Sequence, residues 1–186
     1  DIYHGSFALY ATIANGRLKG NASPPGNLAG AVDLYISPGK WHFYLGNYFE
    51  RLSLSTELAG LQVSAGAYFM TGNDLEPPPG LDSKIAKELG ISVTQMASDR
   101  SKSNADLELG RGFALGANLN LTYDNNGKRL IIRVNAGAGF EFYCLNFGTD
   151  RRCPSGYGPP IGSNGWRASG LIYLYANVYV KFWGVS

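Results

Sequence analysis

The sequence predicts an all-β fold: an antiparallel barrel or sandwich of long amphipathic strands, with one short helix near 82–89. Apolar residues recur at every second position over long stretches, turn-forming pairs separate these stretches, and charged residues make up only 16% of the chain. Side chains alternate between the two faces of a strand, so a period of two indicates β-structure. Such strands build a sheet with one apolar face and one small or polar face.

The first third of the chain supplies the first expected strands. Residues 5–20 predict a strand that turns at Asn15-Gly16, and residues 31–46 predict a hairpin that turns at Pro38-Gly39. Residues 51–70 supply one or two further strands. Several antiparallel strands in succession favour a barrel or a sandwich.

The strand pattern is interrupted between 71 and 106. Three consecutive prolines at 77–79 cannot belong to a central strand, because proline donates no hydrogen bond to a ladder. The short helix near 82–89 is expected because Asp82 suits the N-cap and Gly90 suits the C-cap. The polar residues that follow, 92–106, predict an exposed loop.

The longest hairpin is predicted over 112–142. The pair Asn126-Gly127 is expected at the centre of its turn, with Gly127 at a positive φ angle. A last strand is predicted over 170–182, where Ile172, Leu174 and Val178 share one face. The apolar positions of the hairpin are Phe113, Leu115, Ala117, Leu119, Leu121 and Tyr123, then Leu130, Ile132, Val134, Ala136, Ala138, Phe140 and Phe142.

Composition narrows the class of protein. The formal net charge is only +2 over 186 residues, which gives no basic footprint for nucleic acid. A low charge content with 25 glycines and 12 tyrosines is typical of a β-rich extracytoplasmic protein. We expect residues 1–186 to form a single β domain that is a segment of a longer precursor.

The only two cysteines, Cys144 and Cys153, flank a short loop. A disulfide between them suits an oxidising compartment and is the pairing we expect. Two free thiols in a reduced protein are the alternative.

No catalytic constellation, metal-ligand spacing or nucleotide fingerprint is visible, so we expect a non-enzymatic protein without a cofactor. The two histidines, His4 and His42, lie in strand patterns, and neither forms a metal-type pair. Aromatic residues near the C-terminus offer a candidate assembly or ligand face. Its members are Trp166, Tyr173, Tyr175 and Tyr179. Aromatic residues also pack well on a sheet without binding anything, and that alternative stays open.

Segments 40–54 (KWHFYLGNYFERLSL), 65–80 (AGAYFMTGNDLEPPPG), 110–118 (GRGFALGAN) and 162–178 (GSNGWRASGLIYLYANV) carry a resemblance. Together they resemble a recurring β-rich region of very large, uncharacterised secreted or cell-surface proteins of Bacteroidota-type bacteria. The likeness extends from about Leu28 to Val180. It implies an extracellular or cell-surface location and a non-enzymatic role, and it supplies no catalytic residue.

The sequence therefore predicts an extracytoplasmic structural domain of a cell-surface structure or filament. Its partners would be further copies of itself or neighbouring domains of the assembly. The first alternative is an outer-membrane β-barrel, whose strands are apolar outside and polar or small inside. The second alternative is a carbohydrate-binding module. These functions differ in what the apolar strand face meets: a protein core, another chain or lipid.

Overall fold

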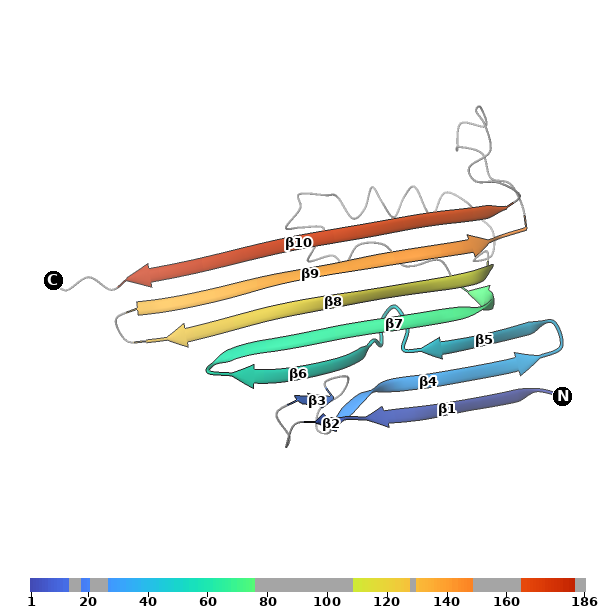
Figure 1. Ribbon diagram of the computed structural model, residues 1–186, viewed down its shortest axis with the longest axis horizontal. Coiled ribbons are helices and arrows are strands. Elements are labelled where there is room, and N and C mark those ends of the chain that lie inside the picture. Colours follow the sequence, from blue (N-terminus) through green and yellow to red (C-terminus); the bar gives the residue numbers. More distant parts are fainter. Residues whose placement is uncertain (14–17, 21–26, 76–108, 128–129, 149–164, 183–186) are drawn as a thin grey trace, which may run out of the picture.

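The computed structural model describes residues 1–13, 18–20, 27–75, 109–127, 130–148 and 165–182. These residues form one antiparallel sheet of ten strands (Figure 1). The all-β barrel or sandwich class expected from the sequence is confirmed, and of the two forms the sheet is barrel-like. The helix expected near 82–89 lies outside the described residues, as does the loop 92–106.

The strands follow the alternating stretches of the sequence, and the longest lie in the C-terminal half. Their bounds are β1 (Tyr3–Tyr10), β2 (Thr12–Ile13), β3 (Leu18–Gly20), β4 (Leu28–Ser37), β5 (Lys40–Leu45), β6 (Leu52–Leu58), β7 (Leu61–Leu75), β8 (Gly110–Asn126), β9 (Leu130–Asn146) and β10 (Trp166–Phe182).

Strand β7 is the centre of the sheet. One of its edges pairs with β8, and β9 and β10 follow outward from there. The other edge pairs first with β6, through 61–67, and then with β5, through 69–72. From β5 the sheet continues through β4 to β1, and from β6 through β3 to β2. Within the described strands β1 and β10 do not pair with each other, so the barrel-like sheet is open between them.

The register lines up apolar residues across the long strands. Leu174 lies opposite Ala138, which lies opposite Leu119, and Leu119 lies opposite Ala65 of β7. A second row joins Ile172, Phe140, Ala117 and Ala67. We call this side of the sheet the apolar face. The opposite side, which carries Tyr68, Asn118, Asn120, Glu141 and Tyr175, is the polar face.

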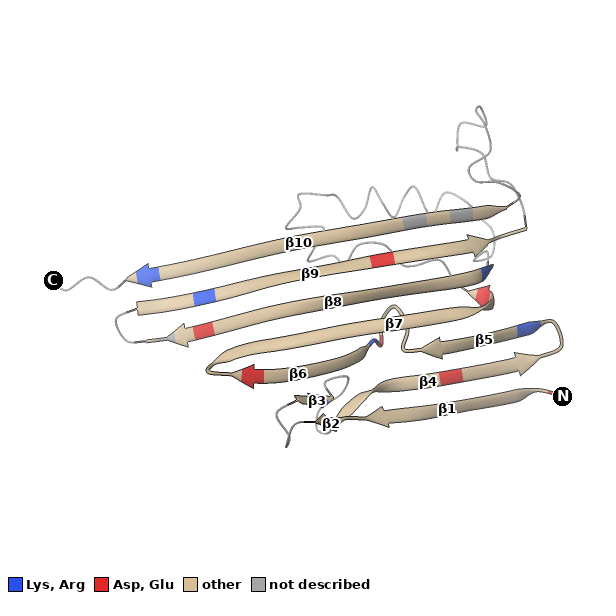
Figure 2. Cartoon of the chain, viewed as in Figure 1, with Lys and Arg blue, Asp and Glu red and all other residues tan. Residues whose placement is uncertain are grey.

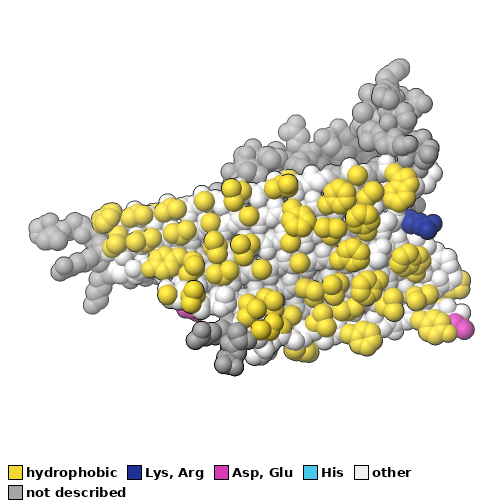
Figure 3. All heavy atoms as spheres, in the orientation of Figure 1, with side chains coloured by type: hydrophobic (Ala, Val, Ile, Leu, Met, Phe, Trp, Pro, Cys, Tyr) yellow, Lys and Arg dark blue, Asp and Glu magenta, His cyan; other side chains and the backbone are white. Residues whose placement is uncertain are grey.

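No part of the described chain covers the apolar face. Figure 3 shows hydrophobic side chains spread over it, with the visible charged side chains at its rim. On β10 the exposed fraction reaches 86% for Ile172, 77% for Leu174 and 73% for Phe182. Even in the middle of the sheet Leu119 is 43% exposed. Among the described residues no second layer packs on this face.

The buried cluster lies on the polar face instead. It contains Tyr68, Met70, Leu75, Ala114 and Leu145, with Tyr44, Tyr48, Tyr143 and Phe147 packed against it. Tyr68 is opposite Gly116 and Met70 is opposite Ala114, so small residues make room for large ones. Burial is thus the reverse of that in a water-soluble sheet protein, whose apolar face is the one that packs into the core.

The turn of the long hairpin differs from the expected one. Strand β8 continues through Asn126, which pairs with Ile131, so Asn126-Gly127 is not the centre of a two-residue turn. Gly127 is not among the described residues with positive φ. The ladder hydrogen bonds outweigh the local turn preference of Asn-Gly here. By contrast, Gly39 adopts φ 85° in the turn expected at Pro38-Gly39.

Nothing helical in the described ranges has the length and hydropathy needed to cross a membrane.

Candidate functional site

A short connection projects onto the polar face in the middle of the sheet. Strands β5 and β6 lie one after the other along the same edge of β7, and residues 46–51 join them. The chain leaves the sheet at Gly46, which has a φ angle of 66°. The Asn47 side-chain oxygen then accepts hydrogen bonds from the backbone N–H groups of Phe49 and Glu50, at 2.8 and 2.7 Å. This is the local turn geometry that asparagine favours.

Arg51 anchors this connection to the sheet. Its guanidinium Nη2 pairs with Glu141 Oε1 on β9, and both side chains are about one-fifth exposed. The second carboxylate oxygen of Glu141 accepts a hydrogen bond from the Tyr68 hydroxyl at 2.8 Å. The guanidinium also lies over the Tyr68 ring, 5.1 Å from its centroid. One carboxylate on β9 therefore holds a tyrosine of β7 and the arginine of the connection together.

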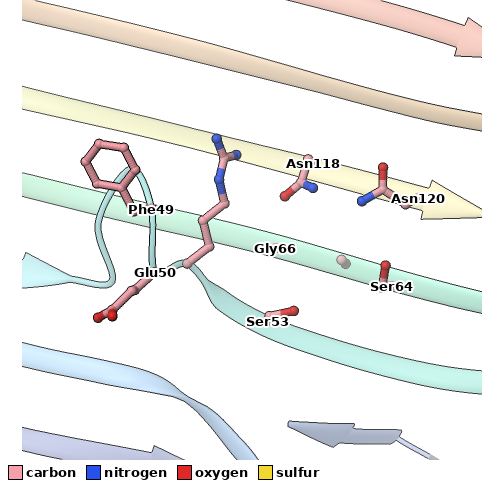
Figure 4. Close-up of a pocket in the computed structure, with 9 residues that line it drawn as sticks. Phe49, Glu50, Ser53, Ser64, Gly66, Asn118 and Asn120 are labelled. Atoms are coloured by element: carbon pink, nitrogen blue, oxygen red, sulfur yellow. The ribbon is translucent and has the colours of Figure 1, made fainter. Parts of the chain in front are cut away.

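A pocket of about 250 Å³ opens beside Arg51 (Figure 4). The connection forms one wall, and strands β6, β7 and β8 form the floor. Figure 4 shows Asn118 and Asn120 on β8, with Ser53 on β6 and Ser64 on β7. The lining residues are Phe49, Glu50, Arg51, Ser53, Ser64, Ala65, Gly66, Asn118 and Asn120. The lining is mainly polar, with one exposed aromatic ring.

Two buried polar atoms among these lining residues have no hydrogen-bond partner within the described part of the chain. They are the donor Nη1 of Arg51 and the acceptor Oδ1 of Asn118. A Cβ atom built on Gly66 would lie 2.6 Å from Asn118 Oδ1 and 3.4 Å from Arg51 Cδ, so Asn118 and the stem of the Arg51 side chain both flank Gly66. Buried polar atoms are normally paired, so an unpaired donor and an unpaired acceptor among the lining residues mark this pocket as a candidate binding position.

The residues expected to form one aromatic face are divided between the two faces. Tyr173 and Tyr175 lie on the polar face, opposite Gly139 and Gly137. Tyr179 shares their face, whereas Trp166 has the alternate position and belongs to the apolar face. Trp166 therefore does not share a face with the three tyrosines, because side chains alternate along β10. A role of these four residues in assembly or ligand binding stays a prediction. Tyr175 contributes to the site indirectly, since its hydroxyl donates to Asn120 Oδ1 at 3.1 Å.

A second polar cluster surrounds His42 on the polar face. Its Nε2 lies 3.0 Å from Asp33 Oδ2, and its Nδ1 lies 3.2 Å from Asp74 Oδ1. The ring is stacked on Tyr44, with 4.2 Å between centroids. His4 contacts the other oxygen of Asp33 at 2.8 Å. The His42 ring is thus held between two carboxylates, with one ring nitrogen near each.

The described residues contain no group of His, Cys, Asp or Glu side chains that could hold a metal ion. Asn73 has a structural role near this cluster. Its oxygen accepts from Trp41 N–H and its nitrogen donates to Gly39 O, both at 2.8 Å, so it braces the β4–β5 turn.

Cys144 carries a free thiol in the structure and is half-buried on β9, while Cys153 lies outside the described residues. The disulfide between them stays a prediction, and an unreduced mass measurement checks it.

Arg51, Glu141, Asn118 and Asn120 were not singled out from the sequence as site residues. The alternation places Asn118 and Asn120 on the small, polar face of the hairpin, and that signal was available. No local pattern, however, indicates that residues 46–51 leave the sheet and bring Arg51 over β7. Searches of family models, curated proteins and solved structures gave no match to this chain.

Proposed function

We propose that this chain forms the wall of an outer-membrane β-barrel, with its apolar face against lipid and its polar face toward an aqueous interior. The observation that carries the proposal is the inverted burial: the uncovered face is apolar, and the buried cluster and ion pairs lie on the other face. Lipid is the solvent in which an uncovered apolar sheet face is stable.

The distribution of charge supports this proposal. Figure 2 shows how sparse charged residues are along the long strands. Of the described strand side chains, only Arg111, beside the first residue of β8, is charged and has a position on the apolar face. Residues 113–123 of β8 and 172–182 of β10 present no charge to that face. Each span matches the roughly 9–11 residues that a tilted strand needs to cross a bilayer.

Aromatic residues on the apolar face occur near both ends of the sheet, with Phe69 and Phe140 between them. Those near one end are Tyr3, Trp41, Phe113, Phe142 and Trp166, and those near the opposite end are Tyr123 and Phe182. Phe113 and Phe142 are neighbours, with 5.9 Å between ring centroids. Tryptophan, tyrosine and phenylalanine rings form girdles at the interfaces of membrane barrels.

The connections are also unequal at the two ends. The longest ones, 76–109 and 147–165, leave β7 and β9 at the end where Phe113 and Trp166 lie, and the two-residue turn 38–39 is at the same end (Figure 1). The connections 59–60 and 127–129 join strands at the opposite end. Membrane barrels have short turns on one side and longer loops on the other.

Folding in different solvents tests the proposal. The purified chain is unfolded in urea and diluted into plain buffer, into zwitterionic detergent micelles or into phosphatidylcholine vesicles. We expect strand-type circular dichroism and heat-modifiable electrophoretic mobility only with detergent or lipid. A folded monomer at micromolar concentration in plain buffer would overturn the proposal.

A second candidate is the structural or filament domain expected from the sequence. The free edge of β10 favours it, because this strand is 17 residues long and its outer edge has no partner among the described strands. Such an edge pairs readily with another chain. Sedimentation equilibrium in a detergent whose density matches that of the solvent measures the mass of the protein alone and separates the two candidates. An assembly domain gives a multiple of the chain mass, and a single barrel wall gives the mass of one chain.

A further inference from the structure

We propose that the pocket between residues 46–51 and the polar face binds a neutral, hydroxylated ligand of the size of one sugar ring. This inference rests on the proposed function only in requiring that the polar face meets water.

The two unpartnered atoms define the chemistry of the ligand. Arg51 Nη1 can only donate a hydrogen bond, and Asn118 Oδ1 can only accept one. A hydroxyl group does both, so the hydroxyl groups of one ligand can satisfy both atoms once a small side-chain shift makes these atoms accessible. A carboxylate, which only accepts, would leave Asn118 Oδ1 unpaired, and an ammonium, which only donates, would leave Arg51 Nη1 unpaired.

The charges around the pocket favour a neutral ligand. The guanidinium of Arg51 is already paired with Glu141, so its charge is largely compensated. Glu50 also lines the pocket, but its carboxylate points away from it (Figure 4). The remaining polar groups, from Ser53, Ser64 and Asn120, are uncharged. Because Tyr175 engages the oxygen of Asn120, the NH₂ group of that amide is left to donate to a ligand.

The shape of the pocket sets the size of the ligand. Its volume of about 250 Å³ lies just below the roughly 300–1,000 Å³ of pockets for drug-sized molecules. Phe49, which is 77% exposed, offers an apolar wall for the C–H face of a sugar ring. Gly66 keeps the floor open, since a Cβ there would lie only 2.6 Å from Asn118 Oδ1.

Binding is measured by isothermal titration of the folded full chain in a detergent without a sugar headgroup, or in buffer if the chain folds there. The probes are D-glucose, D-galactose and N-acetyl-D-glucosamine, with D-glucuronate as a charged analogue of glucose. We expect at least one neutral sugar to bind with a roughly millimolar Kd, as suits so small a ligand. We expect glucuronate to bind at least several-fold more weakly than glucose.

Three variants localise the binding. Asn118→Ala should weaken it about tenfold, because one hydrogen bond to the ligand is lost. Phe49→Ala should weaken it several-fold without affecting folding, since the ring is exposed. Asn135→Ala is the matched control, because it removes the same side chain from an exposed position on the polar face outside the pocket.

Circular dichroism and heat-modifiable mobility confirm folding of each variant before titration. Absence of binding by folded wild-type protein, tighter binding of glucuronate, or equal binding by the Asn118→Ala and Asn135→Ala variants would each overturn the sugar pocket. None of these results tests the membrane proposal, which is tested by whether the chain folds in plain buffer, in detergent or in vesicles.

Discussion

At the scale of single residues, glycine–tyrosine pairs shape the polar face. A Cβ atom at Gly116 would lie 2.6 Å from the Tyr68 ring, and one at Gly137 would lie 2.6 Å from the Tyr175 ring. Each tyrosine lies flat over a glycine of the neighbouring strand, which lets a large ring pack on the sheet without projecting far from it. The position of Tyr68 matters most, because its hydroxyl is bonded to Glu141.

Gly116→Ala should therefore destabilise the fold by about 1–3 kcal/mol, the usual cost of overpacking. The added methyl group displaces the Tyr68 ring and also lies 3.0 Å from Phe140 O. Urea unfolding in detergent measures the change. Gly170→Ala is the control, because a Cβ there meets nothing closer than 3.5 Å. Equal stability of the two variants would contradict this account of the polar face.

The turn glycine shows the limit of local reasoning. Asn126-Gly127 predicts a tight turn with positive φ at Gly127, yet Asn126 remains in the ladder and Gly127 has an ordinary φ. Replacement of Gly127 by valine should still be damaging, for a different reason: its Cβ would lie 2.7 Å from Leu130 O. The thermal unfolding midpoint of the Gly127→Val variant, compared with that of the Asn125→Ala variant, measures this damage. Equal midpoints for the two variants would show that the structure relieves the clash.

At the scale of elements, the long hairpin and the last strand were predictable because alternation is a local signal. Residues 113–142 and 171–182 alternate over many positions, and the strands follow them. Pairing partners are not local. Nothing in residues 40–58 indicates that β5 and β6 occupy one edge of β7 in succession, or that the residues between them turn inward. The pocket depends on that interruption, so the sequence alone could not locate it.

The contact that holds residues 46–51 on the sheet can be tested with one substitution. Glu141→Ala removes the partners of both Arg51 and Tyr68, and should cost roughly 1–3 kcal/mol, as for hydrogen bonds to charged groups. Because residues 46–51 are then no longer held on the sheet, trypsin should also cleave faster after Arg51. Asp124→Ala is the control, because it breaks the exposed Arg133–Asp124 pair, worth at most about 1 kcal/mol. Unchanged cleavage after Arg51 would show that Glu141 does not hold the connection.

Strand β10 allows a direct test of the solvent on each face. Leu174→Arg places a charge on the apolar face, where Leu174 is 77% exposed. On a surface that meets water, such a substitution changes the free energy of unfolding by no more than about 0.5 kcal/mol. On a surface that meets lipid near the bilayer midplane, it lowers the free energy of unfolding by about 2–4 kcal/mol. Asn177→Arg places the same charge on the polar face three positions further on. We expect only the Leu174 variant to fold poorly into vesicles. Equal folding yields would argue against lipid on the apolar face.

At the scale of the whole molecule, the sequence left open what the apolar face meets. Alternation reports that two faces differ, and both a soluble sheet and a membrane sheet satisfy it. The structure adds the position of the buried cluster, which contains Tyr68, Met70 and Leu145 and lies with the glycines and asparagines. That arrangement depends on which residues become neighbours through long-range pairing, and no short window of sequence contains it.

The two edges of the sheet carry one more consequence. Every pairing along the path from β1 through β4, β5, β7, β8 and β9 to β10 is antiparallel, and the path comprises seven strands. Direction reverses at each step, so β1 and β10 point the same way. Joined directly, they would form a parallel seam. A cylinder closed wholly by antiparallel pairs contains an even number of strands, as single-chain bacterial barrels do. Its completion around this wall would require an odd number of additional strands, the first of them running opposite to β10.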